Sequence, residues 1–409
     1  SYDSQFNLNC CERYYPHIGD SGSCGSPGTI CSASTLLEAF DKFGDDRYAR
    51  MAYFLNGHST DGFREDMAKR VEAIVAEQGD WQQTSTNLNG YGLAILRSGD
   101  AVADQRAAWL YYGCAVTNSH THCDRLNIGL FAKGLNLMPD MGYPERTGAW
   151  PKRGAWTNNT ISHNTVVVDR GRQKRVTVGK MRTFSRSPLV RLVGVAREAV
   201  YPQTSLYRRA FAMVDIDEHD SYLVDIFRVK GGAEHHYSFH SAEGDVEFEG
   251  LSLAPQPGGT LAGSDVEFAS FDKKLQGWNE PGIGFQFLRN VRRDTAPPDA
   301  WSVTWKVKDT WNARGQGKRT ETDVRLRLTM LGDHDEVILA TGEPPRLGKP
   351  NNPESLEYLL VHNQGENLAS VFAAVIEPLE GESKLASIKR LPVEPAADDI
   401  DGIEAVALE

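Results

Sequence analysis

The sequence predicts an α+β protein in which a short helical region precedes a large set of antiparallel strands. Two periodicities carry this prediction. Between residues 34 and 78, apolar side chains recur every three or four residues, as on one face of a helix. From Gly90 onward, short apolar or alternating runs are separated by Gly, Asn and Asp, as in strands joined by turns. Helical patterns do not interrupt the strand-like runs, so βαβ units are not expected.

The helical pattern occupies two stretches. Residues 34–56 place leucine and phenylalanine side chains at helical spacing before a break near Gly44. Residues 62–78 repeat the pattern, and Gly79 closes it. We expect these helices to belong to a bundle or a toroid.

Three regions are predicted along the chain. Residues 1–84 hold the helices, residues 85–340 a central antiparallel β-sandwich, and residues 341–409 further strands with an acidic tail. Residues 341–356 are rich in Pro, Gly and Asn and predict a long surface loop. A chain of 409 residues is long enough for two or three domains.

Composition excludes several classes of protein. Hydrophobic residues make up 40% of the chain and charged residues 24%, as in an ordinary globular protein. The formal net charge of −11 argues against nucleic acid as a partner. No apolar run approaches the roughly eighteen residues of a membrane span, so no membrane partner is expected. The first residues lack the pattern of a signal peptide, although a signal removed on export would leave no trace.

Positive charge is concentrated in one segment. Between Arg146 and Arg191 the chain carries eleven Lys and Arg residues and a single acid, Asp169. Such an excess is typical of a surface that attracts and holds a polyanionic ligand. The alternative is a solvated basic face without a ligand.

The cysteines are clustered near the start of the chain. Four of the six lie within the first 31 residues, a spacing that allows one or two disulfides and favours an oxidising compartment. We therefore expect a secreted or periplasmic protein. The alternative is a set of free thiols, and the spacing does not choose between them. The six are Cys10, Cys11, Cys24, Cys31, Cys114 and Cys123.

The residues that carry chemistry lie between positions 119 and 169. His120 and His122 open a strand-like run, where a period of two places both imidazoles on one face. Asp140 follows a second apolar run, and His163 opens a third. Two imidazoles and a carboxylate on neighbouring strands suit zinc and leave a fourth position for water or a sugar oxygen. The alternative is a pair of histidines hydrogen-bonded within a polar cleft.

Two runs in this region resemble the heparinase II/III-like polysaccharide lyases. They are SHTHCDRLNIGLFAKGLNLMPDMGYP at residues 119–144 and WTNNTISHNTVVVD at residues 156–169. The shared pattern is His-x-His-x-Asp, then a Gly-rich hairpin that ends in Asp-x-Gly, then a His-Asn strand. The resemblance is strong over residues 85–245 and weaker elsewhere.

The resemblance implies both a fold and an activity. The fold would be the last helices of an (α/α) toroid followed by a large antiparallel β-sandwich region. The activity would be β-elimination on a uronate-containing anionic polysaccharide or oligosaccharide. Carried over by motif, His122, Asp140 and His163 would bind one structural or site-organising zinc ion, while His120 would face the catalytic cleft.

Further residues near the motif are candidates for substrate contacts. Planar guanidinium groups can bind two oxygens of a carboxylate or sulfate, indole rings can stack on sugars, and an amide can help to neutralise the uronate. The alternatives are packing or exposed arginines, and tryptophans buried in the sandwich. The candidates are Arg125, Arg146, Arg153, Trp150, Trp156 and Asn164.

The toroid residues that the resemblance implies have no clear match. Tyr15, beside His17, is the candidate catalytic tyrosine, although it lies closer to the His-x-His motif than the family pattern implies. The helical region is also shorter than a toroid. We therefore expect either that the chain is a fragment or processed product, or that a partner chain supplies the missing N-terminal toroid segment.

Other motifs are interpreted as unrelated to the activity. Residues 19–22, Gly-Asp-Ser-Gly, match a serine protease motif without its accompanying histidine context. His235, His236 and His240 are predicted to be sandwich histidines or the edge of a cleft. The N-glycosylation sequon at residues 158–160 is predicted to carry no glycan.

The function that these features favour is that of a zinc-containing polysaccharide lyase. The alternative from another class is a non-catalytic glycan-binding or structural module of the same fold. A metal-dependent hydrolase is disfavoured, because no pair of carboxylates suited to glycoside hydrolysis is visible.

Overall fold

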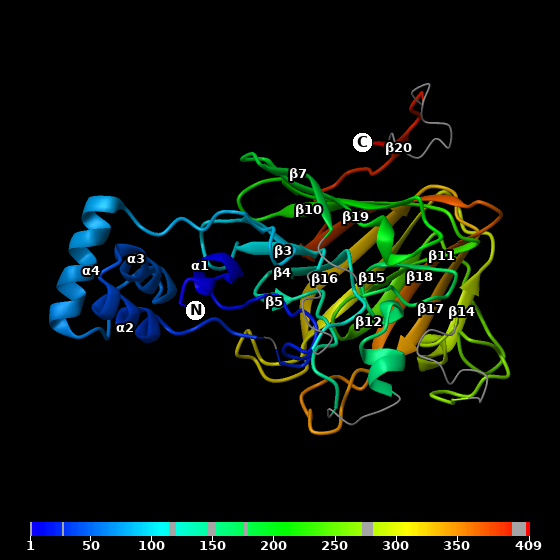
Figure 1. The fold of residues 1–409 in the computed structure, drawn as a ribbon, viewed down its shortest axis with the longest axis horizontal. Coiled ribbons are helices and arrows are strands. Elements are labelled where there is room, and N and C mark those ends of the chain that lie inside the picture. The colour runs from blue at the N-terminus through cyan, green and yellow to red at the C-terminus, as the bar shows by residue number, and fades with distance from the viewer. Residues whose placement is uncertain are drawn as a thin grey trace.

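The computed structural model describes residues 2–26, 28–113, 120–145, 152–175, 179–271, 281–394 and 406–409. A small helical region lies at one end of the molecule, and the sheets occupy the rest (Figure 1). The predicted α+β class, with antiparallel strands dominating, is confirmed.

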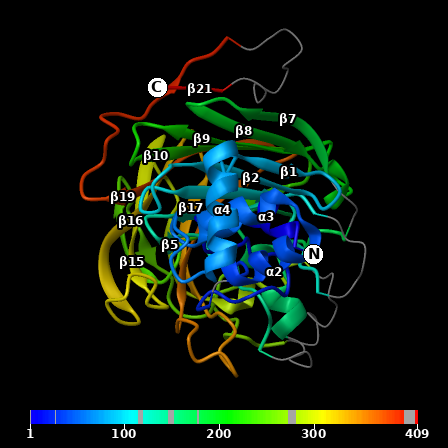
Figure 2. The same cartoon turned by 90° about the vertical axis from the view of Figure 1, so that its left-hand side faces the viewer.

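The helical region is held together by apolar faces. Helices α2 (Ala33–Phe43), α3 (Asp46–Leu55) and α4 (Glu65–Gln78) share one core with the short α1 (Ser4–Leu8). They lie in front of the sheets when viewed from their own end (Figure 2). Gly44 ends α2 with φ of 65° and Gly79 follows α4 with φ of 76°, so both predicted breaks are confirmed. No helix in the described residues has the length and apolar character that crossing a membrane requires.

Two large antiparallel sheets form the sandwich. The eight-stranded sheet has the order β12-β15-β16-β19-β10-β9-β8-β7, and the six-stranded sheet the order β13-β14-β17-β18-β11-β6. The first contains β7 (Lys180–Arg186), β8 (Val190–Ala196), β9 (Leu206–Asp215), β10 (Ser221–Lys230), β12 (Gly244–Glu249), β15 (Ala300–Asp309), β16 (Thr320–Leu331) and β19 (Ala369–Glu380). The second contains β6 (Val166–Val168), β11 (Glu234–His240), β13 (Ala254–Pro255), β14 (Leu288–Asp294), β17 (Glu336–Gly342) and β18 (Leu356–Gln364).

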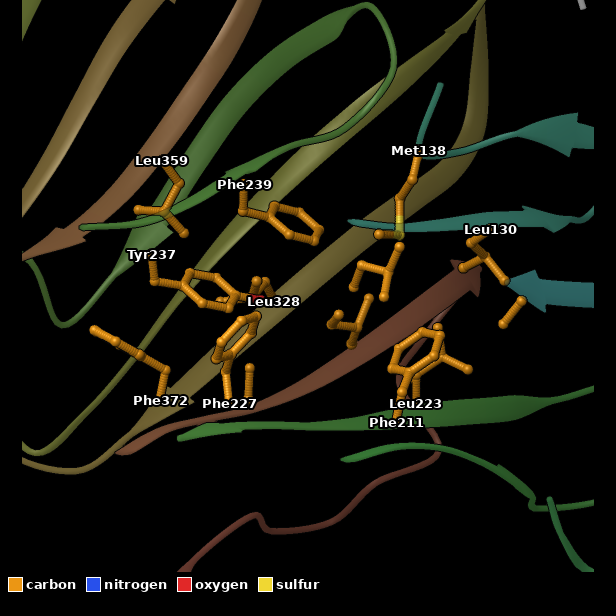
Figure 3. Packing of buried hydrophobic residues seen from close by; sticks show 14 of the residues in the cluster. Leu130, Met138, Phe211, Leu223, Phe227, Tyr237, Phe239, Leu328, Leu359 and Phe372 are labelled. Carbon is orange, nitrogen blue, oxygen red and sulfur yellow. The ribbon is translucent and has the colours of Figure 1, made fainter. Parts of the chain in front are cut away.

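The main core fills the space between these sheets. Phe227 of β10 and Phe372 of β19 meet Tyr237 and Phe239 of β11 there (Figure 3). Each large apolar side chain buried in this way stabilises the fold by about 1.5–3 kcal/mol. Since side chains alternate along a strand, His236 of β11 lies on the outer face of the six-stranded sheet.

A third sheet joins the helical region to the sandwich. It contains β1 (Thr86–Leu88), β2 (Leu93–Ser98), β3 (Arg106–Tyr111), β4 (Asn127–Ala132) and β5 (Leu135–Asn136) in sequential order. One face adds Leu96 and Leu110 to the main core, and the other packs Trp109 against Cys10 and Tyr14. The N-terminal residues around Cys10 therefore pack on the β region, although residues 1–84 were predicted to be helical.

The predicted boundary at residue 341 lies inside the sandwich. Strand β18 pairs with β11 and β17, and β19 pairs with β10 and β16. Both strands are interior to their sheets, so the chain beyond residue 341 completes the sandwich. The predicted loop does occur between β17 and β18. A final two-stranded ribbon pairs β20 (Arg390–Leu391) with β21 (Ala407–Leu408).

The sequence patterns missed β7, β12 and β14. Strands β7 and β12 are the two edges of the eight-stranded sheet, and β14 lies next to the edge of the six-stranded sheet. Edge strands are often charged, because charge discourages pairing with another chain. Strands β7 and β14 lack a sustained apolar alternation, and in β12 the alternation is limited to Val246 and Phe248 among acidic residues.

The described cysteines are free thiols. Cys10, Cys11, Cys24, Cys31 and Cys123 form no disulfide with one another, and Cys114 lies outside the described residues. The predicted disulfides are therefore absent from the described part of the chain. Burial raises the pKa of Cys10 to about 12, so that thiol is unreactive near neutral pH.

A buried ion pair connects the eight-stranded sheet to the loops beside it. Arg209 of β9 donates from Nε to Asp225 Oδ1 at 2.7 Å, and Tyr237 donates its hydroxyl to Asp225 Oδ2 at 2.7 Å. The guanidinium also donates to the carbonyls of Leu126 and Asn164, the latter at 2.6 Å. One side chain thereby fixes two loops that are about forty residues apart in sequence.

We predict that Arg209→Met lowers the free energy of unfolding by about 3–5 kcal/mol, because it leaves the Asp225 carboxylate buried without its cation. Chemical denaturation followed by intrinsic fluorescence measures the change. Arg182→Ala, on the exposed edge strand β7, is the control and should change stability by less than about 0.5 kcal/mol. Equal effects of the two substitutions would contradict the structural role of the pair.

Candidate functional site

Three separate loops bring the predicted metal ligands together. His122 lies in the loop before β4, Asp140 follows β5, and His163 directly precedes β6. Asp124, two residues after His122, joins them. The four residues are buried, and their ligating atoms all lie within 4.8 Å of one another. The motif therefore predicted three members of one cluster, and the structure adds a fourth.

Asp140 is the centre of this cluster. Its Oδ2 accepts hydrogen bonds from His163 Nδ1 at 2.8 Å and from Asn127 Nδ2 at 3.1 Å, and its Oδ1 accepts from the Gly142 N–H at 2.9 Å. His122 Nδ1 lies 3.7 Å from Oδ1. Burial alone would raise the pKa of Asp140, but the two imidazoles and the backbone N–H lower it far below its usual range. Burial lowers the pKa of His163, yet Asp140 outweighs that effect and raises it.

Three buried atoms of the cluster have no hydrogen-bond partner among the described residues. They are His122 Nδ1, His163 Nε2 and Asp124 Oδ2. An unpartnered buried polar atom costs about 1–3 kcal/mol, so three in one cluster call for an additional partner. A divalent cation bound within the cluster would supply partners of this kind. Two nitrogen and two carboxylate donors suit tetrahedral zinc, so the residues fit the metal that the sequence predicted.

Asp20 connects this cluster to the exposed His120. Its Oδ1 accepts from His122 Nε2 at 3.1 Å, and its Oδ2 accepts from His120 Nδ1 at 3.0 Å and from Arg153 Nη2 at 2.6 Å. Burial would raise the pKa of Asp20, but hydrogen bonds from the two histidines and the charge of Arg153 lower it. With its proton held on Nε2, His122 keeps the Nδ1 lone pair for a metal.

Sequence reasoning missed Asp20. The residue lies 100 positions before His120, in the Gly-Asp-Ser-Gly stretch that was interpreted as an unrelated motif. No local pattern marks it, because its histidine partners come from a distant loop. Asp124 did carry a signal, as the aspartate of the His-x-His-x-Asp pattern.

The prediction that His120 and His122 share one face of a strand is wrong. His120 has φ of 63°, outside the extended region, and β4 begins only at Asn127. The turn exposes 66% of the His120 side chain while the His122 side chain is fully buried. The two imidazoles instead bond different oxygens of the Asp20 carboxylate. His120 also faces Tyr143, with ring centroids 6.5 Å apart.

Tyr15, the candidate catalytic tyrosine, lies beside a second buried histidine. Its ring centroid is 6.0 Å from that of His17, and Gly28 packs so closely that a Cβ there would lie 2.1 Å from Tyr15 Cζ. His17 accepts a hydrogen bond from the Gly28 N–H. Burial lowers the pKa of His17 to about 4, so this imidazole is neutral at pH 7. The catalytic role of Tyr15 stays a prediction.

The arginine candidates occupy different positions. Arg125 is 1% exposed, and its Nη1 donates to the His122 carbonyl at 3.0 Å and to Asp124 Oδ1 at 3.1 Å. This placement fits the packing alternative better than contact with substrate. Arg153 is mostly buried and binds Asp20. Arg146 lies outside the described residues.

The remaining substrate candidates are also buried where they are described. Trp156 donates from Nε1 to the Glu343 carbonyl at 2.8 Å and packs against Tyr358 in a second core outside the six-stranded sheet. Asn164 donates from Nδ2 to the His240 carbonyl at 3.2 Å and accepts from the His240 N–H at 2.8 Å. Both placements favour structural roles over contact with sugar. Trp150 lies outside the described residues.

The basic segment does not form one surface. Arg175 is exposed and donates to the Thr121 carbonyl at 3.4 Å, next to His120. Arg170 instead lies over the Phe285 ring, 4.4 Å from its centroid. The cations of β7 belong to the edge of the eight-stranded sheet, at the top of the view in Figure 1. Only part of the segment therefore lies near the metal ligands.

Two of the three β11 histidines form hydrogen bonds through their ring nitrogens to neighbouring groups of the sandwich. His235 bonds Ser370 Oγ at 2.8 Å and the Gly231 carbonyl at 2.9 Å. His240 bonds the Ser241 carbonyl at 3.0 Å through Nδ1. These positions agree with the interpretation made from the sequence.

Solved structures with the same fold include polysaccharide lyases. The heparan sulfate lyase HepC from Pedobacter heparinus is 14% identical, with 100% of this chain and 52% of that chain covered at a TM-score of 0.58. A heparinase III gene product is 12% identical, with 100% and 51% covered at a TM-score of 0.59. At these identities the likeness shows the fold, and this chain spans about half the length of each protein. A search of curated proteins found no significant match.

The sequence itself identifies the family. Residues 82–337 match the model of the family described as Heparinase II/III-like, C-terminal, and this range covers more than half of the chain. The matched range contains the four residues of the buried cluster and His120, and it begins just before the third sheet. The chain therefore belongs to the heparinase II/III-like family and contains its C-terminal β-sandwich domain.

Proposed function

We propose that the protein is a polysaccharide lyase that cleaves a uronate-containing anionic glycan by β-elimination. In this proposal the chain supplies the metal-bearing sandwich half of the cleft. The observation that carries it is the exposed His120, held by the same Asp20 carboxylate that holds the buried cluster residue His122. Family membership and the fold shared with a heparan sulfate lyase support the substrate class. A secreted or periplasmic location suits such a substrate.

The reaction explains why an oriented histidine is useful. A base removes the proton at C5 of the uronate, the C4–O4 bond breaks, and a C4–C5 double bond forms. The departing sugar oxygen takes up a proton. Negative charge grows on the uronate carboxylate as the C5 proton leaves, so a donor aimed at that carboxylate stabilises the transition state. His120, whose Nδ1 donates to Asp20, presents Nε2 to solvent, and in the imidazolium form this nitrogen is a donor that can take the role.

Tyr143 is a further acid–base candidate within this half of the cleft. Its ring faces His120, and the ammonium of Lys349 lies 5.4 Å from the centre of the ring. A tyrosine hydroxyl can serve as the acid or the base in such a proton transfer. Tyr15 remains the alternative that the sequence suggested. The toroid residues implied by the family resemblance would come from a helical segment on the same polypeptide or on a partner chain.

We further propose that the buried cluster binds one zinc ion through His122, Asp124, Asp140 and His163. When bound, zinc would supply the positive charge that the unpartnered donor atoms lack. The residues themselves then tie three loops into one rigid unit and hold His122 against Asp20. His120 is oriented through that same carboxylate and need not touch the metal.

The first test of this function is metal content. After dialysis against metal-free buffer, the wild-type chain should retain about one zinc ion, measured by inductively coupled plasma mass spectrometry. His122→Ala and His163→Ala should lose it and melt at a lower temperature, because the ligands join separate loops. A metal-free wild-type protein with an unchanged melting temperature would overturn the zinc assignment.

The second test separates His120 from the ligands. In the full-length gene product, His120→Ala should reduce turnover by roughly two to four orders of magnitude while keeping zinc and stability. Formation of the unsaturated product from a panel of uronate polymers, followed by ultraviolet absorbance, measures turnover. Full activity in His120→Ala would contradict its role, and a wild type that binds the polymers without forming product would support a non-catalytic binding module.

The third test concerns charge beside His120. Arg175→Ala should weaken binding of an anionic oligosaccharide and flatten its dependence on salt, because exposed charges are screened over roughly 10 Å at 0.1 M salt. Isothermal titration calorimetry at several salt concentrations provides the affinities. Arg182→Ala, on β7, is the matched control and should leave them unchanged. If both substitutions act alike, the segment steers ligands only through its total charge.

A further inference from the structure

A second group of metal-ligating side chains lies on the outer face of the six-stranded sheet. His236 of β11 and His362 of β18 are paired across the two strands, and Glu234 lies two residues before His236 on the same face. One ligating atom from each of the three residues lies within 4.8 Å of the others. The group shares no residue with the cluster around Asp140.

The imidazoles of this group are buried and incompletely bonded. His236 is 3% exposed and His362 is 9% exposed, and their rings stack with centroids 4.3 Å apart. His236 Nδ1 and His362 Nε2 have no hydrogen-bond partner in the described part of the chain. Buried polar atoms normally have partners, so two unpartnered nitrogens in a group that also contains a carboxylate can accept a bound partner. His235 on the same strand differs from His236, because both of its ring nitrogens have hydrogen-bond partners.

A third strand sets the proton position on His362. Glu336 of β17 is the register partner of His362, and its Oε2 lies 3.5 Å from His362 Nδ1. Arg293 fixes this carboxylate with two contacts, at 2.9 and 3.0 Å. A carboxylate beside one ring nitrogen keeps the proton there and leaves the lone pair on the other. The lone pair of His362 therefore lies on Nε2, the nitrogen without a partner.

We propose that His236, His362 and Glu234 form a second divalent-metal site, with zinc as the ion that this donor set suits. Two imidazole nitrogens and one carboxylate oxygen are a common zinc triad, and a fourth position stays open to water or an anion. The ion would link β11 to β18 at the register position where His236 and His362 are already paired. The site is independent of the proposed lyase function.

The surrounding charges make this the weaker of the two metal sites. Arg170, which lies over Phe285 against the His236 ring, and Arg293 are both cations close to the group. Glu234 and Glu336 offset these charges one for one, whereas the first cluster contributes two buried carboxylates directly to the ion. The same arginines favour an anion as the fourth ligand.

Titration of Zn²⁺ into the EDTA-stripped chain, followed by calorimetry, tests the proposal. The wild type should show two classes of site, of which only the tighter survives dialysis. The double variant His236→Gln/His362→Gln should lose the weaker class alone, and His122→Ala the tighter class alone. Glu234→Gln should weaken the second class at least tenfold. His219→Gln removes an exposed imidazole, 65% accessible, and should leave both classes intact.

The outcomes separate the two metal sites. A wild type with a single class that disappears in His122→Ala would overturn the second site while leaving the first. Two classes that persist in both the double variant and Glu234→Gln would also overturn it, since the ion would then bind elsewhere. Circular dichroism in EDTA shows whether the variants are folded. If the double variant does not fold, the result for Glu234→Gln, at a partly exposed position, decides the question.

Discussion

The ion pair between Arg209 and Asp225 anchors the two loops that carry the histidines of the buried cluster. Its guanidinium holds the carbonyls of Leu126 and Asn164, and each of these residues lies within a few positions of a ligand histidine. Neither residue lies in regular secondary structure, and both loops also bond neighbouring strands, Leu126 through its N–H to the Tyr111 carbonyl at 2.7 Å and Asn164 through its amide to the backbone of His240. The buried pair anchors both loops to β9 close to the two histidines that lie against Asp140.

The site contains a buried histidine, His122, and an exposed histidine, His120, for which we propose different roles. His122 has its proton held by Asp20, which leaves Nδ1 for a metal, whereas His120 uses the other oxygen of the same carboxylate and faces solvent. A shared second-sphere carboxylate couples the stability of the cluster to the orientation of the surface group. Substitution of Asp20 would therefore affect both, although Asp20 itself is not one of the four clustered residues.

The sequence predicted those parts of the molecule in which burial dictates the order of apolar and polar residues. Interior strands such as β10 and β18 were recognisable because buried side chains impose apolar runs, while the edge strands β7 and β12 carry charge instead. His122, Asp140 and His163 were predicted through a family motif, which preserves spacing across loops. Asp20 could not be, since its partners are 100 residues away and no local period connects them. The positive φ of His120 also has no signal, because its neighbours resemble a strand.

The central claim is that the loops anchored by Arg209 converge on a single metal-binding cluster. Anomalous X-ray diffraction at the zinc absorption edge, from crystals of the zinc-loaded chain, tests this claim most directly. We predict a strong peak enclosed by His122, Asp124, Asp140 and His163, with Asp20 bonded to His122 outside the coordination sphere. No peak at that position, in crystals that hold zinc elsewhere, would contradict it.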